Sequence, residues 1–502
     1  MTPVQEADVA IVGSGICGML VARELAGKGR DVTVIERGGR KSHAEQLQSR
    51  SQRVDIPSAA PNHESHPDGD EYPWDYVYGV GGSSLHWAGV APRLLASDFE
   101  LRTRFGVGRD WPLAADELTP FYDEAERVLE VAGGGDNPLF PGRRPYPYPP
   151  HPYAPVDRLV APLMRSYFPL PQARPTRAIG GRPACCGSAA CRLCPVDARY
   201  SVLHTIGDEK LLDGKGLVLR DRTVAARLRT EGRRVTGIDC IGADGKRSTL
   251  RARTVVLAAN GIENAAILLR SDLSSPDTGK WLYDHEHRLI YLTLDRSARH
   301  GAGTSLATGV CYDYVEGDFR RRRGSLLVYP YNPGRLVLDD LMGELIDGNE
   351  GRAVRDRLRE RFDRTLVLDS LGEDLPRRER SIELSPRKDS FGLPLNRIRY
   401  PADSEYLERT RRAVYSDLER RLRPLRARIE KTFPVAQGAH QLGTCFMGER
   451  EGVVDADQRH HRFGNLYVAG GSAFPSYSSH HPTLTIAALA LRLGRHLAAR
   501  VE

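Results

Sequence analysis

Two adjacent histidines near the end of the chain are candidates for acid–base chemistry. In "SSHHPTLTIAALALRLG" (478–494), His480 and His481 stand directly before Pro482 and an apolar stretch with helical spacing. Proline suits the first position of a helix and pushes the preceding residue to extended geometry, so we expect His481 at the N-cap. The positive end of the helix dipole favours a neutral imidazole there. The segment therefore predicts a base or hydrogen-bond partner at a helix end that also attracts negative charge.

A glycine-rich loop at the start of the chain predicts a nucleotide site. The apolar run 9–12 leads into Gly13, Gly15 and Gly18, an amphipathic helix pattern follows, and "DVTVIE" predicts a second strand that ends at Glu36. In such a βαβ unit the glycines allow a tight turn, a close approach to a pyrophosphate, and close packing of helix on strand. The helix N-terminus faces the phosphates, and the acidic residue accepts the ribose hydroxyls. The pattern predicts a dinucleotide but does not distinguish FAD from NAD.

Length and charge narrow the class of protein. A chain of 502 residues is too long for one ordinary core, so two or three domains and room for a large cofactor are expected. The net charge of +7 is modest and the basic residues are mixed with acids, which argues against nucleic-acid binding. The one dense basic run, 320–323, is interpreted as a solvated loop or strand end, with an anion site as the alternative. No signal pattern and no apolar stretch of the ~20 residues that a membrane span needs is seen, so we expect a cytoplasmic protein.

The longer motifs resemble the glucose-methanol-choline (GMC) family of FAD oxidoreductases. "YGVGGSSLHWAGVAPRL" (78–94) is a second glycine-rich loop, and "TVVLAANGIENAAILLRS" (254–271) is similar to the family's strand-turn-helix near the flavin. "HQLGTCFMG", "GVVDADQRHHRFGNLYVAGGSAFP" and "HHPTLTIAALALR" match its C-terminal segments. The motifs are closest to the sugar dehydrogenase (glucose and gluconate dehydrogenase) and pyranose oxidase branches. The resemblance implies FAD as the cofactor.

The same resemblance implies a catalytic pair. His440 stands in a His-x-x-Gly-Thr motif and His481 in a His-Pro-x-Leu-Thr motif. In the family, the first group removes the hydroxyl proton while hydride leaves the same carbon for flavin N5, and the second orients the alkoxide. Which of the two is the base stays open, and a shift of one residue would exchange His481 with His480. The resemblance also implies further contacts with the flavin cofactor, at Gly81, Gly82, Ser83, His86, Gly471, Pro482 and Thr483.

His86, in "SSLHW", raises a separate question about the flavin. The stretch resembles the loop through which some family members attach the flavin covalently to a histidine. Covalent attachment, a non-covalent flavin contact and simple packing all remain open.

A short cysteine-rich stretch predicts a metal or cluster site. "CCGSAACRLCPVDARYS" contains Cys185, Cys186, Cys191 and Cys194, the last followed by proline. A Cys-x-x-Cys-Pro pattern is typical of iron-sulfur ligation, and the stretch resembles one in FAD-dependent glucose and gluconate dehydrogenases. The last spacing is one residue shorter than in that branch. An iron-sulfur cluster on Cys185, Cys191 and Cys194, thiols or a disulfide that hold the loop, and zinc are the three alternatives.

These elements predict an α/β fold, with α+β architecture in a cap. We expect a Rossmann-like FAD-binding domain built from residues 1–275, which include the cysteine-rich loop 185–194, and from residues 433–502. An antiparallel-sheet substrate domain, residues 276–432, is inserted between them. Strand patterns "RLIYLTL" and "GSLLVYPY" and a helical pattern "EYLERTRRAVYSDLERRL" lie in that insertion.

The predicted function is FAD-dependent oxidation of a hydroxyl group on a sugar, polyol or glycoside, including sugar units of natural products. The alternative is a non-redox lyase of the cyanohydrin type, in which FAD is structural. Oxygen, a quinone, a redox protein and an internal cluster are all candidate electron acceptors.

Overall fold

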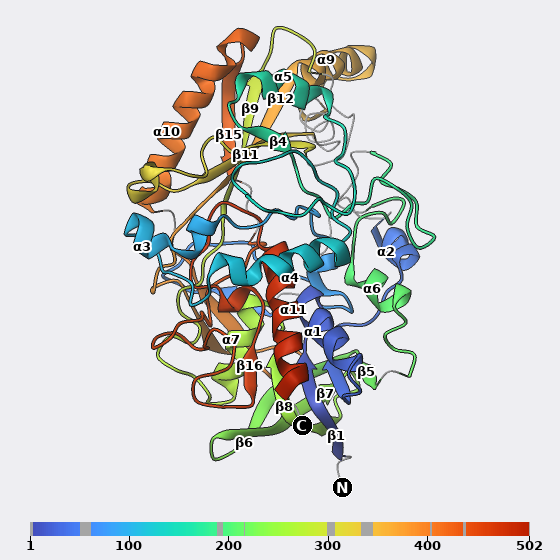
Figure 1. The fold of residues 1–502 in the computed structure, drawn as a ribbon. Coiled ribbons are helices and arrows are strands. Elements are labelled where there is room, and N and C mark those ends of the chain that lie inside the picture. Colours follow the sequence, from blue (N-terminus) through green and yellow to red (C-terminus); the bar gives the residue numbers. More distant parts are fainter. Residues whose placement is uncertain are drawn as a thin grey trace.

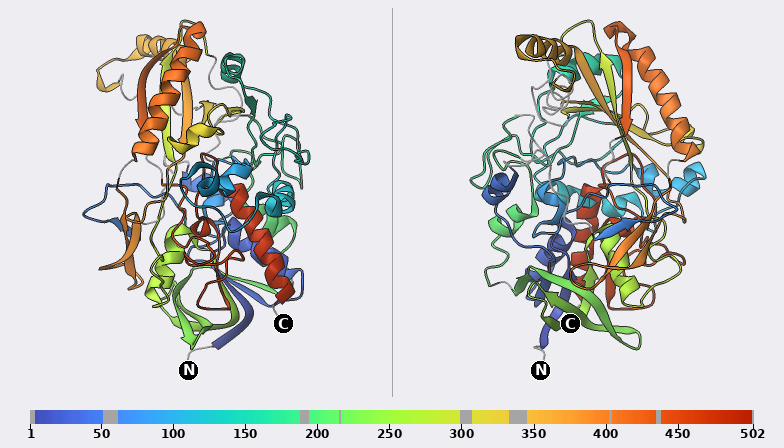
Figure 2. Two further views of the ribbon diagram at one scale, coloured as in Figure 1. Left: turned by 60° about the vertical axis from the view of Figure 1, so that its left-hand side comes forward. Right: turned by 180° about the vertical axis from the view of Figure 1, so that it is seen from behind.

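The computed structural model describes residues 4–50, 62–187, 194–214, 216–298, 307–332, 345–401, 404–434 and 438–500. Within these residues the strands form a seven-stranded, a six-stranded and a three-stranded sheet. The seven-stranded sheet occupies the lower half of Figure 1 and the six-stranded sheet the upper half. Both chain ends lie at the far end of the seven-stranded sheet in every view (Figures 1 and 2).

The seven-stranded sheet is the predicted Rossmann-type layer. Its order is β5-β2-β1-β8-β7-β6, with β16 paired to β8, and β1 runs parallel to both β2 and β8. Residues 9–12 of β1 and all of β2 are buried, as expected for strands covered on both faces. The bounds are β1 (Val4–Val12), β2 (Val32–Ile35), β5 (Leu217–Arg220), β6 (Thr223–Glu231), β7 (Arg234–Gly242), β8 (Arg247–Leu257) and β16 (Leu466–Val468).

The first and last helices pack together beside this sheet. Helix α1 (Ile16–Ala26) contacts α11 (Thr483–Arg500), which also contacts α4 (Ala115–Val128) (Figure 1). The two helices approach closely at Gly494, where an added Cβ would lie 2.6 Å from the Cβ of Glu24. The C-terminal segment thereby joins the N-terminal βαβ unit. The other described α-helices are α2 (His43–Arg50), α3 (Leu101–Phe105), α5 (Pro155–Val160), α6 (Val202–Asp208), α7 (Asn260–Arg270), α9 (Gly351–Arg364) and α10 (Glu405–Leu422).

The six-stranded sheet is antiparallel throughout and confirms the predicted cap architecture. Its order is β15-β9-β12-β11-β10-β4. One face packs on α10, whose bounds match the predicted helical pattern, and residues of the opposite face, such as Leu327, pack with Val90 and Leu95. Because side chains alternate along a strand, Val328 of β11 faces α10, whereas Tyr329 belongs to a separate core on the other face. The bounds are β4 (Tyr167–Pro169), β9 (Glu286–Thr293), β10 (Gly309–Cys311), β11 (Leu326–Tyr331), β12 (Thr365–Gly372) and β15 (Arg428–Pro434).

Chain segments cross the predicted domain boundaries, which stay a prediction. Helix α5 and strand β4 come from the first predicted segment and pack with the six-stranded sheet. Conversely, β13 (Ser381–Lys388) and β14 (Pro394–Arg399) form a small sheet with β3 (His63–Ser65). In the described part of the chain, no helix combines the length and apolar character needed to cross a bilayer.

Candidate active site

The first glycine loop has the shape that a dinucleotide requires. Gly13 has a φ of +103°, and an added Cβ there would lie 2.4 Å from the carbonyl oxygen of Ala258. Gly18 lies against the loop itself, because its Cβ would stand 2.0 Å from the Gly13 oxygen. At Gly15, the residue before α1, a Cβ would meet no atom within 4 Å. The loop is therefore packed on the sheet side and open at the helix N-terminus, where a pyrophosphate binds in such units.

Glu36 lies at the end of β2 and joins the loops around this opening. Its Oε2 accepts hydrogen bonds from Ser14 N (3.1 Å) and Ser14 Oγ (2.8 Å), and its Oε1 accepts from Gly38 N (2.9 Å) and Gly79 N (3.1 Å). Burial raises the pKa of the Glu36 carboxyl, and these donors oppose the rise. The carboxylate thus organises both glycine loops, and its contact with an FAD ribose stays a prediction.

The second glycine loop touches the first. Gly81 N donates to Ser14 Oγ (3.2 Å), and a Cβ on Gly82 would lie 3.2 Å from the Cα of Gly15. The short 3₁₀ turn Gly82–Leu85 follows, and the carbonyl of Ser83 accepts the backbone N–H of His86. The predicted cofactor residues Gly13, Gly15, Gly18, Gly81, Gly82 and Ser83 are thus brought together. The imidazole of His86 is nearly buried, with Nε2 3.5 Å from Asp75 Oδ1.

His440 and His481 meet although they come from separate segments. Their ring centroids are 5.3 Å apart and their planes are inclined by 89°. The two segments are joined at Gly471, whose carbonyl accepts the backbone N–H of Gly443 and whose Cβ would lie 2.7 Å from Leu442 Cδ2. Burial, with help from neighbouring histidines, lowers the pKa of both His440 and His481 well below 6.5, so both rings are neutral.

The start of α11 differs by one position from the sequence prediction. The helix begins at Thr483, and Pro482 O accepts the first helical hydrogen bond, from Ile486 N. Pro482 is therefore the N-cap, and the prediction of His481 at that position was wrong. The cause is that the proline's carbonyl already takes part in the helix while His481 remains in the preceding loop. His481 still lies at the helix N-terminus.

His480 points away from the pair. Its Nδ1 lies 2.9 Å from Ser478 Oγ, and its ring packs against the rings of Phe140 and Tyr312. Burial lowers the pKa of His480 to about 4. Ser478 Oγ donates to Asp98 Oδ2 (2.8 Å), which extends the contacts into the protein interior. The two adjacent histidines thus have different surroundings, and only His481 is beside His440.

Arg320 belongs to this buried network, so the prediction of a solvated run was wrong for it. Its side chain is 0% exposed, donates to Asp98 Oδ1 (2.8 Å) and to Glu373 Oε2 (3.2 Å), and its neighbour Arg321 is 57% exposed. The two carboxylates come from distant parts of the sequence, which is why the basic run did not indicate burial. Glu373 also accepts the backbone N–H of Ser325, and Ser325 Oγ accepts that of Ser479.

Sequence reasoning missed His285, which contacts His440 directly. His285 Nδ1 lies 2.8 Å from His440 Nδ1, and His285 Nε2 lies 2.5 Å from the carbonyl oxygen of Ser478. Burial lowers the pKa of His285 to about 3. The neighbouring Asp284 accepts the backbone N–H groups of His285 (2.8 Å) and His440 (3.1 Å), and burial raises the pKa of Asp284 to about 7. The alternating "DHEH" (284–287) directly before a predicted strand was the available signal.

The six-stranded sheet supplies a polar wall on the other side of the pair. The hydroxyl of Tyr329, on β11, lies 3.4 Å from His481 Nε2. On the adjacent strands, His287 Nε2 lies 2.5 Å from Asp369 Oδ1, and the side chain of His287 remains 23% exposed. This wall was missed because it depends on strand pairing between distant segments.

The predicted metal site cannot be assembled from the described residues. Cys191 lies outside them, Cys185 is half-buried, and Cys194 is buried with its Sγ accepting Ala198 N (3.2 Å). Over the ranges that the structure describes, no cysteine belongs to a group of three potential metal ligands. The iron-sulfur cluster therefore stays a prediction without structural support.

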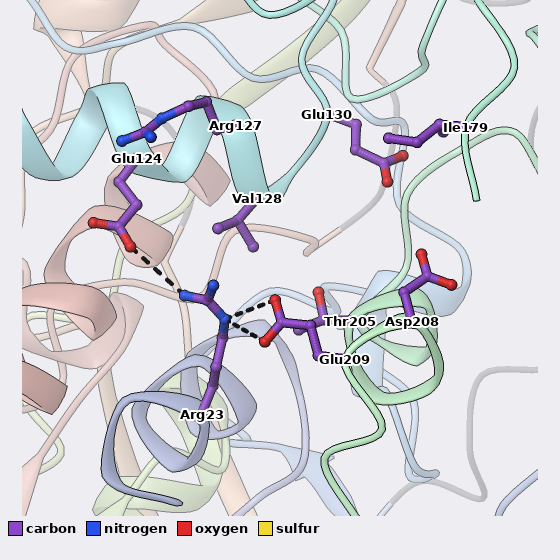
Figure 3. A pocket seen from close by; sticks show the side chains of 9 residues that line it. All are labelled: Arg23, Glu124, Arg127, Val128, Glu130, Ile179, Thr205, Asp208 and Glu209. Atoms are coloured by element: carbon purple, nitrogen blue, oxygen red, sulfur yellow. Dashed lines mark hydrogen bonds and ion pairs between the residues drawn. The ribbon is translucent and has the colours of Figure 1, made fainter. Parts of the chain in front are cut away.

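A separate hollow of about 300 Å³ lies between α1, α4 and α6 (Figure 3). Its lining is mostly charged, and Arg23 Nε donates to both carboxylate oxygens of Glu209 at 2.8 Å. None of the histidines of the candidate site lines it. It is therefore not the substrate pocket that His440 and His481 would serve.

Known proteins are similar to this chain over most of its length. Family models described as GMC oxidoreductase match residues 171–287 and 376–490, and one described as FAD dependent oxidoreductase matches residues 8–57. The chain is 30% identical to the fructose dehydrogenase large subunit of Gluconobacter japonicus, over 97% of this chain and 96% of that protein. It is 29% identical to the 6'''-hydroxyparomomycin C oxidase of Streptomyces lividus, over 98% and 92%.

A solved structure shares the fold. The crystal structure of pyridoxine 4-oxidase from Mesorbium loti matches with a TM-score of 0.66 and 18% identity, over 98% of this chain and 99% of that one. The models, the relatives and the fold agree over nearly the whole chain. The chain belongs to the GMC oxidoreductase family of FAD-dependent enzymes that act on CH–OH groups.

Proposed function

We propose that the protein oxidises a hydroxyl group of a sugar, polyol or glycoside, with His440 as the base and His481 as the group that holds the substrate oxygen. The observation that carries the proposal is the perpendicular pair of neutral imidazoles, of which His481 is buried beside Tyr329 of the six-stranded sheet and His440 is 18% exposed. The substrate class is supported by the printed names of two relatives, a fructose dehydrogenase and a hydroxyparomomycin oxidase.

Each group of the site has one role in the proposed reaction. The Gly13–Gly18 loop and Glu36 would hold FAD, which when bound would supply the acceptor for the hydride of the carbinol carbon. His440 accepts the hydroxyl proton, a contribution that is typically ~10²–10⁴-fold in rate. His481 stabilises the oxygen as negative charge develops, and the N-terminus of α11 favours that charge. Because both rings are neutral, neither needs to lose a proton before the reaction begins.

Anaerobic spectroscopy tests the proposal. Holoenzyme is mixed without oxygen with a panel of ketoses, aldoses, sugar alcohols, glycosides and aminoglycosides, and the flavin absorption band is followed. Bleaching by a sugar-like alcohol supports the proposal, and bleaching only by alcohols unlike sugars would overturn the substrate class. A cyanohydrin that is cleaved without bleaching would instead establish the lyase alternative. Admission of air then separates oxygen from a quinone or a redox protein as the electron acceptor.

A further inference from the structure

We infer that His285 is a positioning residue that keeps the single ring proton of neutral His440 on Nδ1, so that Nε2 carries the lone pair that accepts the substrate proton. This inference rests on the proposed role of His440 as the base. In this role His285 acts only through its contact with His440.

The partner of His285 Nε2 is an atom that can only accept a hydrogen bond. His285 Nε2 lies 2.5 Å from the carbonyl oxygen of Ser478, and a carbonyl has no proton to give. The ring proton of His285 must therefore be on Nε2. Burial lowers the pKa of His285 to about 3, so the ring is neutral and its Nδ1 bears a lone pair.

That lone pair decides the tautomer of the next ring. His285 Nδ1 and His440 Nδ1 are 2.8 Å apart with the rings nearly perpendicular, at 88°. A hydrogen bond of this length needs one donor and one acceptor, so His440 must donate from Nδ1. His440 is also neutral, which leaves its Nε2 without a proton.

The surroundings reinforce this arrangement. Asp284 Oδ1 lies 3.8 Å from His440 Nδ1 and accepts the backbone N–H groups of both His285 and His440, which fixes the two residues relative to each other. Tyr72 donates to the other oxygen of Asp284 at 2.9 Å. A negative or partly negative oxygen on this side favours the proton on Nδ1.

The ring of His481 has a different partner. Its Nε2 lies 3.4 Å from the hydroxyl of Tyr329, which is itself hydrogen-bonded to Asp369. The chain that ends at the Ser478 carbonyl reaches His440 through His285, and this chain leaves Nε2 of His440 as the acceptor.

The test measures the tautomer of His440 and the rate of flavin reduction separately. Holoenzyme labelled with ¹⁵N-histidine reports by NMR which ring nitrogen of His440 is protonated, with the signal assigned by its loss in His440→Gln. Two variants are compared: His285→Gln, whose amide offers one donor and one acceptor, and His285→Met, which offers neither. His480→Gln, in the same loop as His481 but outside the pair, controls for removal of a buried histidine.

We expect the His440 proton on Nδ1 in the parent, in His285→Gln and in His480→Gln, and a shift toward Nε2 in His285→Met. Flavin reduction should slow about 10²-fold or more in His285→Met but less than about tenfold in His285→Gln, with substrate affinity unchanged in both. In serine proteases, imposing the wrong tautomer on the catalytic histidine costs about 10⁴-fold.

Two outcomes would overturn the inference. One is a parent spectrum with the His440 proton on Nε2. The other is His285→Met with the proton still on Nδ1, even if its reaction is slow, because the residue would then be merely structural. If no alcohol reduces the flavin, the proposed function fails, while the NMR comparison still decides the role of His285.

Discussion

His440 and His481 lie edge to face, with centroids 5.3 Å apart and ring planes at 89°. One ring follows the last strand of the six-stranded sheet, and the other precedes the helix that packs on α1. Their contact therefore joins the segment after β15 to the N-terminus of α11. Neutral rings in this arrangement can act on one hydroxyl group from two directions.

The opening at Gly15 predicts how FAD binding can be removed without unfolding the protein. A Cβ there meets no protein atom within 4 Å, so Gly15→Leu should fold but fill the space needed by the pyrophosphate. We expect purified Gly15→Leu to carry little FAD, measured by absorbance of the released flavin per chain. Gly207→Leu, at an exposed helical glycine that also has open space, is the control and should retain FAD. Normal FAD content in Gly15→Leu would disprove the role of the loop.

The neutral state of His440 predicts a flat pH profile. Burial, and then His285 and His481, lower the pKa of His440 well below 6.5. The base is active when unprotonated, so the rate constant for flavin reduction should stay constant from about pH 8 down to pH 6.5 and fall only at more acidic pH. Stopped-flow reduction at saturating substrate measures it. An acid limb with its midpoint at or above 6.5 is incompatible with this environment.

Acid sensitivity of the fold should come partly from His480. Burial lowers its folded-state pKa to about 4, whereas the unfolded value is 6.5. Below pH 6.5 the unfolded chain binds the extra proton, so the free energy of unfolding should fall as the pH drops from 6.5 to about 4. One such proton contributes a slope of about 1.4 kcal/mol per pH unit. In urea denaturation, His480→Gln should show a flatter profile than the parent in this window; parallel profiles would refute the assignment.

Arg320 should be far more important for stability than its neighbour. Arg320→Met leaves Asp98 and Glu373 buried without their cation, which should cost about 3–5 kcal/mol in the free energy of unfolding. Arg321→Met, at an exposed side chain, is the matched control and should change it by less than about 0.5 kcal/mol. Equal effects from both substitutions in urea denaturation would contradict the buried network.

The features that the sequence predicted well are contained within single short segments of the chain. The βαβ loop and the α10 helix each lie within one short segment, and spacing alone indicates their structure. The motifs around His440 and His481 are equally short, but the resemblance to the family identified them. The N-cap of α11 was misplaced by one residue, because the preference around proline does not fix which carbonyl accepts the first helical bond.

What the sequence could not predict depends on contacts between distant segments. His285 precedes a strand that was recognised, but its partners His440 and Ser478 lie far along the chain. Tyr329 faces His481 only because β11 pairs with β12 in a register that no single segment reveals. Arg320 looked solvated for the same reason, since its charge is compensated by carboxylates from two other regions.

In the proposed reaction, His440 takes the hydroxyl proton while His481 holds the substrate oxygen. The most direct test is stopped-flow reduction of the bound flavin, without oxygen, by any sugar-like alcohol that the enzyme accepts. We expect His440→Ala to retain FAD but to reduce it ~10²–10⁴-fold more slowly than the parent. The rate of flavin reduction should fall less in His481→Asn than in His481→Ala, because asparagine still donates a hydrogen bond. His480→Ala should reduce the flavin at nearly the parent rate. Flavin reduction in His440→Ala as fast as in the parent would place the base elsewhere and contradict the mechanism, and a severe loss in His480→Ala with a normal rate in His481→Ala would contradict the assignment of the pair.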